Sequence, residues 1–234
     1  DPMDILAMAE LWRLDPSDEN RERLLGRVAD DVQLLIEVAC DYAGVARWQD
    51  ASDLLRLWPG VAHDDPAHAM LYYHLAYCQD KLGHGDEARR LYALASRMDR
   101  EFVFPHRLEE LDVLRRAVEI EPEDARAWSY LGTLLYALRR KDEAMDAWRR
   151  SLALEPDAVT CRNLGKALWL DKRDLAGAKA QYERATALRP DDYRLYVDLY
   201  DMMKEMGATA QQRTALLENA PQHGRVQSRL AAAL

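Results

Sequence analysis

Metal-ligand chemistry is the first kind that the residue types suggest, because His74 and Cys78 stand four positions apart in a predicted helix. That spacing places two side chains on one face of a helix, as in some zinc sites. A zinc site needs three or four protein ligands, and no third ligand stands near these two in the sequence. Cys78 is instead typical of a small apolar residue in a packed helix. The sequence therefore predicts neither a metal ion nor another cofactor.

Acid–base catalysis is the second kind, since the chain has two adjacent acidic pairs, Asp64-Asp65 and Glu109-Glu110. Neighbouring residues do not face each other on a helix, so we interpret both pairs as surface charge. The chain also lacks the H-E-x-x-H, P-loop, G-x-G-x-x-G and G-x-S-x-G motifs of common catalytic sites. The sequence therefore predicts that this chain, taken alone, is not an enzyme.

The charge balance limits the kinds of partner. The chain carries 32 basic and 41 acidic residues, a formal net charge of −9, whereas nonspecific nucleic-acid binding needs a basic surface. No apolar stretch approaches the roughly 20 residues of a membrane-spanning helix. The three cysteines, Cys40, Cys78 and Cys161, lack a disulfide-framework spacing, which favours a reducing compartment. We therefore expect a cytoplasmic protein that binds neither nucleic acid nor a membrane.

The elements that would position any binding residues are indicated by residues 125–156. This stretch resembles the tetratricopeptide repeat, whose pattern is W-x2-L-G-x2-Y…A-x3-F…P. The matching positions are Trp128, Leu131, Gly132, Leu135, Ala144, Trp148, Ser151 and Pro156. A second copy follows, in which Ala178 stands 34 residues after Ala144, the repeat length of that family. One extra residue falls in the turn near 171–174, and we expect the loop to accommodate it.

Weaker copies of the pattern precede these two. The clearer one comprises Tyr72, Leu75, Ala76, Gly83, Ala88, Tyr92 and Ala95. The fainter one comprises Leu35, Val38, Ala39, Tyr42, Ala51 and Leu55. Because a helical hairpin of this kind buries its apolar face only by stacking on neighbours, the sequence predicts an all-α fold. The resemblance implies a right-handed α-α superhelix, a solenoid of antiparallel helix pairs.

The pattern also divides the chain into segments. We expect N-terminal helices in 1–30, two divergent repeats in 31–100, an extended link plus a half-repeat in 101–122, two well-formed repeats in 123–192, and a divergent repeat with a C-terminal helix in 193–230. The link is expected at 101–107, because Pro105 disfavours a helical conformation at Phe104. Residues 231–234 resemble a cloning remnant, and we expect the chain to be a piece of a longer protein.

Several strings resemble one particular group of proteins, the C-terminal tetratricopeptide region of large, uncharacterised bacterial proteins. They are HAMLYYHLAY (68–77), FVFPHRLEELDVLRRAV (102–118), YLGTLLYALRRKDEAMDAW (130–148), CRNLGKALW (161–169) and QQRTALLENAP (211–221). In that family the repeats follow a mutarotase-like β-sandwich domain of unknown function, a kind of domain associated with carbohydrates. The resemblance therefore implies a missing N-terminal domain as one partner.

In tetratricopeptide stacks the first helix of each pair lines a concave groove, and this geometry names the candidate site residues. They are Tyr73, His74, Tyr77, Arg126, Ser129, Tyr130, Thr133, Tyr136, Arg162, Asn163, Lys166 and Trp169, followed by Arg194, Asp198 and Asp201. Aromatic faces offer apolar area with a polar rim, and arginine or asparagine adds directional hydrogen bonds. An anionic ligand could bind Arg126, Arg162 and Lys166 through charge-assisted hydrogen bonds.

Two functions stay open at this point. The first is a non-catalytic scaffold that binds a peptide, a protein or its own missing domain in the groove. The alternative is the helical accessory domain of a carbohydrate-active or carbohydrate-binding bacterial enzyme, with Tyr136 or Trp169 contributing to a sugar site. The aromatic residues could also pack between neighbouring first helices or form a docking surface for the sandwich domain.

Overall fold

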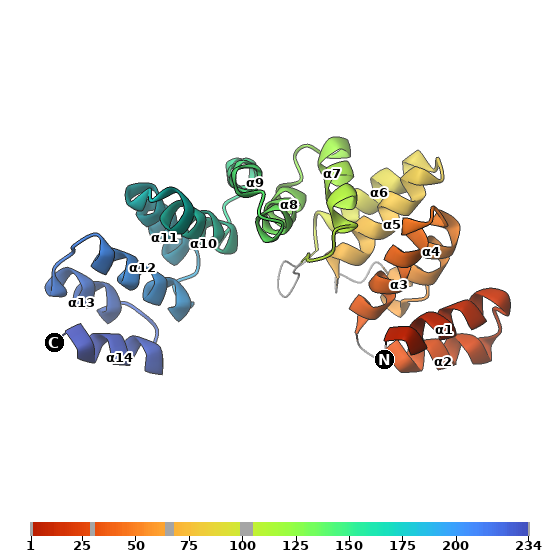
Figure 1. Ribbon diagram of the computed structural model, residues 1–234, viewed down its shortest axis with the longest axis horizontal. Helices are drawn as coiled ribbons and strands as arrows, with labels where there is room; N and C mark the ends of the chain where they lie inside the picture. The colour runs from red at the N-terminus through yellow and green to blue at the C-terminus, as the bar shows by residue number, and fades with distance from the viewer. Residues whose placement is uncertain (1, 29–30, 64–67, 99–104, 234) are drawn as a thin grey trace. The chain divides into compact units, whose positions relative to one another are not determined.

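All regular elements of the described chain are helical, as the computed structural model shows for residues 2–28, 31–63, 68–98 and 105–233 (Figure 1). They form two compact units, residues 1–134 and 135–234. The all-α fold of stacked helix pairs is therefore confirmed. The division between the units falls inside a helix of the best-formed repeat, which the sequence pattern did not indicate.

The first unit is a series of antiparallel helix pairs. Its elements are α1 (Pro2–Leu14), α2 (Asp18–Val28), α3 (Val32–Gly44), α4 (Trp48–Leu55), the short 3-10 helix η1 (Pro59–His63), α5 (Ala69–Lys81), α6 (Gly85–Ala95), α7 (Glu110–Ile120) and the start of α8 (Ala125–Ala137). Helix α1 packs on α2, α3 on α4, and α5 on α6. Pairs also stack on their neighbours, since α3 and α4 both contact α5.

The second unit continues the alternation. After the end of α8 it contains α9 (Lys141–Leu154), α10 (Ala158–Ala167), the π-helical turn η2 (Leu168–Lys172), α11 (Leu175–Leu188), α12 (Tyr193–Glu205), α13 (Ala210–Glu218) and α14 (Gly224–Ala233). Helix α10 packs on α11, and α12 on α13. The predicted cloning remnant overlaps the end of α14, and its origin stays a prediction.

The small and large residues of the repeat pattern fill the core as a packing argument requires. Ala144 and Ala178 are fully buried, and Trp148 and Tyr182 pack as large buried side chains. A Cβ added to Gly165 would lie 3.1 Å from Cδ2 of Tyr182, so glycine permits the close approach of α11. The fainter repeats obey the same rule, because Leu35, Tyr42, Leu75 and Tyr92, among others, are buried.

Trp128 differs from the packing role that the sequence suggested. Its side chain is half-buried, and its indole N–H donates to the carbonyl of Pro122 at 2.9 Å. Trp128 lies in the first turn of α8, where the ring reaches back over the connection from α7. It therefore ties a loop to a helix end, whereas Trp148 fills the interior.

The half-repeat is formed by α7, which packs on α5 and α6. It begins at Glu110, inside the segment 101–122 that was expected to contain the link and the half-repeat. Pro105 is buried and residues 105–107 have no helical structure. The other residues of the predicted link, including Phe102 and Phe104, lie outside the described residues.

The extra residue in the second well-formed repeat is accommodated by a helix end and not by the loop. Helix α10 widens into the π-helical turn η2, after which Arg173 takes a left-handed conformation. The amide of Asp174 then donates to the carbonyl of Leu168 at 3.0 Å. A π-turn is a common way to absorb one inserted residue.

Left-handed residues close the turn inside several helix pairs. Among the described residues, Gly83 (φ 83°) and Gly207 (φ 76°) have this conformation, as do Ala46 (φ 60°), Arg139 (φ 63°) and Arg173 (φ 55°). In each case a first helix has just ended, which is where a left-handed residue satisfies the last carbonyls. Glycine takes this conformation without steric cost, but alanine and arginine do not.

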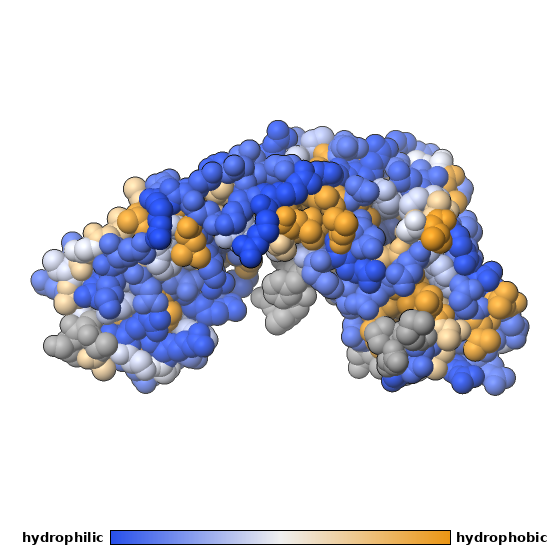
Figure 2. All heavy atoms as spheres, viewed as in Figure 1, coloured by the Kyte–Doolittle hydropathy of each residue, from blue (hydrophilic) through white to orange (hydrophobic). Residues whose placement is uncertain are grey.

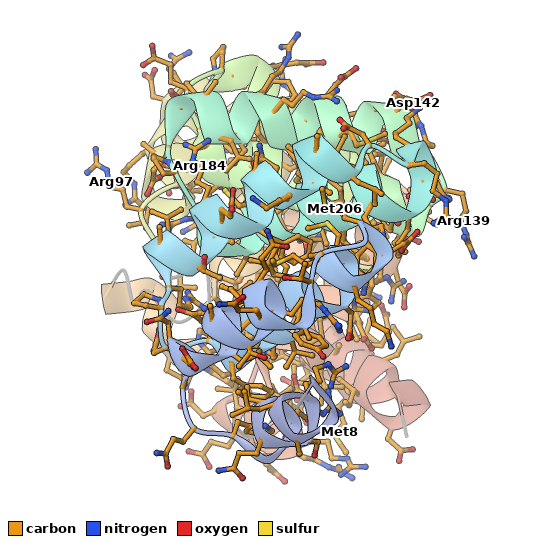
Figure 3. All side chains as sticks on the ribbon, turned by 90° about the vertical axis from the view of Figure 1, so that its left-hand side faces the viewer. Met8, Arg97, Arg139, Asp142, Arg184 and Met206 are labelled. Atoms are coloured by element: carbon orange, nitrogen blue, oxygen red, sulfur yellow. The ribbon has the colours of Figure 1, made fainter. Side chains whose placement is uncertain are left out.

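Replacing Arg139 by glycine is expected to stabilise the protein by about 0.5–1 kcal/mol. The left-handed conformation costs a non-glycine residue about 1–2 kcal/mol, and the greater freedom of glycine in the unfolded chain offsets part of that gain. Figure 3 shows the Arg139 side chain projecting away from the helices, so its removal leaves no cavity. Urea unfolding measures the change, with Gly207→Ala as a control that should destabilise. A lower midpoint for Arg139→Gly would contradict this account of the turn.

Hydrophilic residues dominate the face of the molecule shown in Figure 2. Within the described residues no helix is long and apolar enough to cross a membrane.

Candidate interaction surface

Four of the residues that were expected to line an accessible groove are buried instead. Tyr73, His74, Ser129 and Tyr130 are each at most 7% exposed, so they have almost no surface to offer a partner. Helix α5 contacts α3, α4, α6 and α7, which together cover it. Tyr73 and Tyr130 pack against each other, in agreement with the possibility that the aromatic residues fill the space between helices.

Tyr73 belongs to a buried polar network. Its hydroxyl donates to Oδ2 of Asp124 at 2.7 Å, and its ring lies edge-on to Tyr130 at a centroid distance of 6.3 Å. The other oxygen of Asp124 accepts the backbone amides of Arg126 and Ala127 at 3.0 and 2.9 Å. Asp124 therefore caps α8 and joins it to α5. Burial raises the pKa of Asp124 above its ordinary value, against these hydrogen bonds.

His74 lies in a second buried cluster, between Cys40 of α3 and Glu110 of α7. Its ring nitrogens are 3.9 and 4.0 Å from Sγ of Cys40, and Nε2 is 3.9 Å from Oε1 of Glu110. All three side chains are at most 3% exposed. His74 thus contacts residues 34 and 36 positions away in the sequence, Cys40 and Glu110.

Glu110 has a further structural task. Its Oε2 accepts the backbone amides of His106 and Arg107 at 2.6 and 2.9 Å. The carboxylate thus fixes the segment before α7 as well as contacting His74. Burial alone would raise the pKa of Glu110, but His74 and the backbone amides outweigh it and lower the pKa. Burial would likewise lower the pKa of His74, but Cys40 and Glu110 raise it to about 9.

Tyr77 and Arg126 are accessible candidates of the first unit. The ring of Tyr77 is edge-on to Trp48 at 5.7 Å, and Nζ of Lys81 lies 5.0 Å from its centroid. Arg126 is half-buried near the start of α8. Thr133, also half-buried, donates its hydroxyl to the carbonyl of Ser129 at 3.0 Å. Thr133 is therefore satisfied within its own helix.

Tyr136 opens the candidate surface of the second unit. Its hydroxyl donates to Oδ2 of Asp171 at 2.7 Å, and its ring lies 5.5 Å from that of Trp148. Lys141 forms an ion pair with the other oxygen of Asp171. Burial and the hydrogen bond to Asp171 raise the pKa of Tyr136 to about 12. The Tyr136 hydroxyl therefore stays protonated and donates its hydrogen bond to Asp171.

Arg162 of α10 and Trp169 of η2 are each held by a carboxylate of α12. Arg162 donates through Nε to Oδ2 of Asp198 at 2.9 Å, and Trp169 donates its indole N–H to Glu205 at 2.5 Å. Arg173 also pairs with Glu205 at 2.8 Å. Asp198 therefore neutralises the charge of Arg162. The three residues that were expected to bind an anion, Arg126, Arg162 and Lys166, thereby lose one member.

The remaining candidates separate into paired and unpaired side chains. Arg194 pairs with Asp192 at 2.7 Å, and Asp201 pairs with Arg229 at 2.6 Å. Asn163 and Lys166 lie between Arg162 and Trp169 on α10. Lys166 is exposed and Asn163 half-exposed, and neither side chain has a hydrogen bond or ion pair to the described residues.

The sequence prediction missed Asp171 and Glu205, and it named Asp198 as a candidate without its role as the partner of Arg162. Asp171 and Glu205 stand 35 and 36 positions after Tyr136 and Trp169, and Asp198 stands 36 positions after Arg162. A donor followed one repeat later by an acid was the signal that could have found them. Such pairs join successive first helices and make the surface rigid.

The comparisons with known proteins agree with the repeat pattern. The family model of the tetratricopeptide repeat matches residues 125–158. The peroxisomal targeting signal receptor of Candida albicans is 41% identical over 56 residues, which are 24% of this chain and 10% of that protein. The cytochrome c-type biogenesis protein CycH of Bradyrhizobium diazoefficiens is 36% identical over 89 residues, 36% of this chain and 24% of that protein. The chain thus spans at most about a quarter of the curated relatives named here.

Solved structures of MamA resemble this chain at low similarity. One, from Desulfovibrio magneticus RS-1, is 17% identical with a TM-score of 0.44, and the match covers 88% of this chain and 98% of that one. Another, MamA MSR-1, is 16% identical with a TM-score of 0.43, covering 85% and 97%. Similarity at this level says nothing about function. Residues 125–158 are a tetratricopeptide repeat, and the chain has the helix-pair fold that such repeats build.

Proposed function

We propose that this chain is a non-catalytic scaffold that binds a peptide or protein segment through the accessible side chains of its first helices. A tetratricopeptide repeat fold is consistent with a protein–protein interaction scaffold. The name of one curated relative, a targeting signal receptor, describes a protein whose role is binding. The partner is a separate protein or another domain of the same polypeptide.

The observation that carries the proposal is the pair Asn163 and Lys166 on α10. Both lie on the stripe of α10 that Arg162 and Trp169 flank, and those two residues are fixed by Asp198 and Glu205. A rigid surface loses little conformational entropy when a ligand binds. Asn163 can donate and accept hydrogen bonds, and Lys166 adds a cation. Neither group has a hydrogen bond or ion pair to the residues that the structure describes.

The carbohydrate alternative gains no comparable support. Sugar sites use the exposed face of an aromatic ring together with polar groups that are free to bond hydroxyls. The hydroxyl of Tyr136 and the indole N–H of Trp169 already donate to Asp171 and Glu205. The ring of Tyr136 also lies against Trp148.

Selection of peptides from a random display library on the immobilised chain tests the proposal. Peptides that bind are expected to lose at least about tenfold in affinity to a variant with Asn163→Ala and Lys166→Ala, a difference of about 1.4 kcal/mol. The matched control is Lys179→Ala with Glu183→Ala, which removes an ion pair on the second helix α11 and should leave binding unchanged. A library without binders, or binding that only the α11 variant weakens, would refute the proposal.

A further inference from the structure

We infer that Arg126 binds the carboxylate of an aspartate or glutamate side chain in an acidic peptide segment. This inference rests on the proposed function, because it names the chemistry of the ligand that one accessible first-helix residue would recognise.

Two donors of the Arg126 guanidinium lack a hydrogen-bond partner among the described residues, although the carboxylate of Asp124 lies near enough to interact with its charge. The Nε and Nη1 atoms of Arg126 are shielded from solvent and have no hydrogen-bond partner in the part of the chain that the structure describes. A guanidinium keeps its proton at any ordinary pH, so the charge persists. Leaving a shielded charged donor unsatisfied is costly for a protein, and a bound anion would remove that cost.

Asp124, two positions earlier, interacts electrostatically with Arg126 but forms no hydrogen bond with Nε or Nη1 of its guanidinium. Both oxygens of Asp124 are already engaged, one by the Tyr73 hydroxyl and the other by the backbone amides of Arg126 and Ala127. Asp124 therefore binds the main chain of Arg126 but makes no ion pair with its guanidinium. A hydrogen-bond acceptor for Nε and Nη1 would therefore come from a ligand.

The chain itself indicates what kind of anion suits such an arginine. Arg162 of α10 takes its carboxylate from Asp198, 36 positions later. Residues 158–164, which stand at the same sequence distance from Arg126, contain no acidic residue. Arg126 thus lacks the internal carboxylate that Arg162 has, and a partner's side chain would supply it.

A single carboxylate fits better than a more highly charged group. The planar fork of a guanidinium matches a carboxylate through two parallel hydrogen bonds. The net charge of −9 repels anions over long distances, and the repulsion grows with the charge of the ligand. Arg126 is only partly buried, so its flexible side chain can turn its N–H groups toward a ligand.

Nuclear magnetic resonance of the full chain tests the inference, with N-acetyl-aspartate N′-methylamide as the probe. The Nε–H signal of Arg126 is assigned by its disappearance in Arg126→Gln. We expect this signal to shift and saturate as the probe is added, whereas that of Arg97 should follow only a shallow linear trend. Arg97 is a suitable control because it is an exposed arginine that projects into solvent (Figure 3). The corresponding asparagine compound should shift neither.

Two variants separate charge from shape. Arg126→Lys keeps the charge but loses the fork, and it should weaken binding of an aspartate-containing library peptide by at least about tenfold. Arg126→Gln should abolish the dependence on the aspartate. If either variant fails to fold, the resonance shifts of Arg126 and Arg97 in the unaltered chain still show whether the probe binds at Arg126.

The outcomes also distinguish this inference from the proposed function. Library peptides that bind the chain and Arg126→Gln equally, together with no saturable shift at Arg126, would overturn the inference and leave the scaffold proposal standing. A saturable shift at Arg126 without any peptide binder would support the site and count against the scaffold.

Discussion

Glu110→Ala is expected to destabilise the protein by about 3–5 kcal/mol, the cost of removing one partner of a buried ion pair. Glu110 is 1% exposed and contacts His74, which is 3% exposed. The substitution leaves His74 without its carboxylate and leaves the amides of His106 and Arg107 without an acceptor. Urea unfolding followed by circular dichroism measures the loss.

Glu110→Gln is the matched control, because glutamine keeps a hydrogen-bond acceptor for the two amides but removes the charge. We expect it to cost clearly less than alanine. Equal losses for the two variants would show that the charge of Glu110 accounts for the loss, and that its volume and its role as an acceptor for the two amides do not. A loss below about 1 kcal/mol for alanine would contradict the buried-pair account.

The pair of His74 and Glu110 also predicts how the stability of the folded protein depends on pH. The pKa of His74 is raised to about 9 in the folded protein, so its contribution is full below its ordinary value of about 6.5 and is lost as the pH rises to 9. The pKa of Glu110 is lowered, so its contribution is full above its ordinary value of about 4.3 and is lost as the pH falls through the folded value. In Glu110→Gln the free energy of unfolding, measured by urea unfolding, should fall less steeply between about pH 6.5 and pH 9. An unchanged slope would contradict the account in which Glu110 helps to raise the pKa of His74.

Trp148→Ala is expected to cost about 3–5 kcal/mol, the usual range for emptying a buried tryptophan site. Trp148 is 2% exposed and lies against Tyr136. Trp128→Ala should cost less, because Trp128 is only half-buried and its indole N–H bonds a carbonyl of a loop, that of Pro122. A single such bond contributes about 0.5–1.5 kcal/mol.

Thermal and urea unfolding of the two variants measures the contrast. Two tryptophans of the same repeat pattern then report different environments, which the pattern itself does not reveal. A Trp128→Ala variant as unstable as Trp148→Ala would contradict the positions that the structure gives them.

Periodicity was enough to predict the helix pairs. Helices α1 and α2 fall within residues 1–30, where N-terminal helices were expected, and Ala144 and Ala178 of the repeat pattern are fully buried. This part succeeds because a 34-residue repeat fixes which faces must be apolar. The start of α7 at Glu110 was missed, since Glu110 turns its carboxylate back to the preceding amides.

The candidate surface was harder to predict, because exposure depends on which helices stack on one another. Tyr73 and Tyr130 have the residue type of a binding surface, yet they pack edge-on in the core. Arg162 has the charge of a ligand site, yet Asp198 neutralises it. The burial of Tyr73 and the pairing of Arg162 each depend on a residue in another repeat, and a pattern within one repeat contains no information about such a residue.

The central claim is that accessible first-helix side chains bind a peptide segment, and calorimetric titration of a library-selected peptide tests it most directly. The full chain should bind the peptide at a ratio of one to one, and the Asn163→Ala, Lys166→Ala variant should bind it at least about tenfold more weakly with an unchanged unfolding midpoint. Equal affinity for the full chain and this folded variant would contradict the claim.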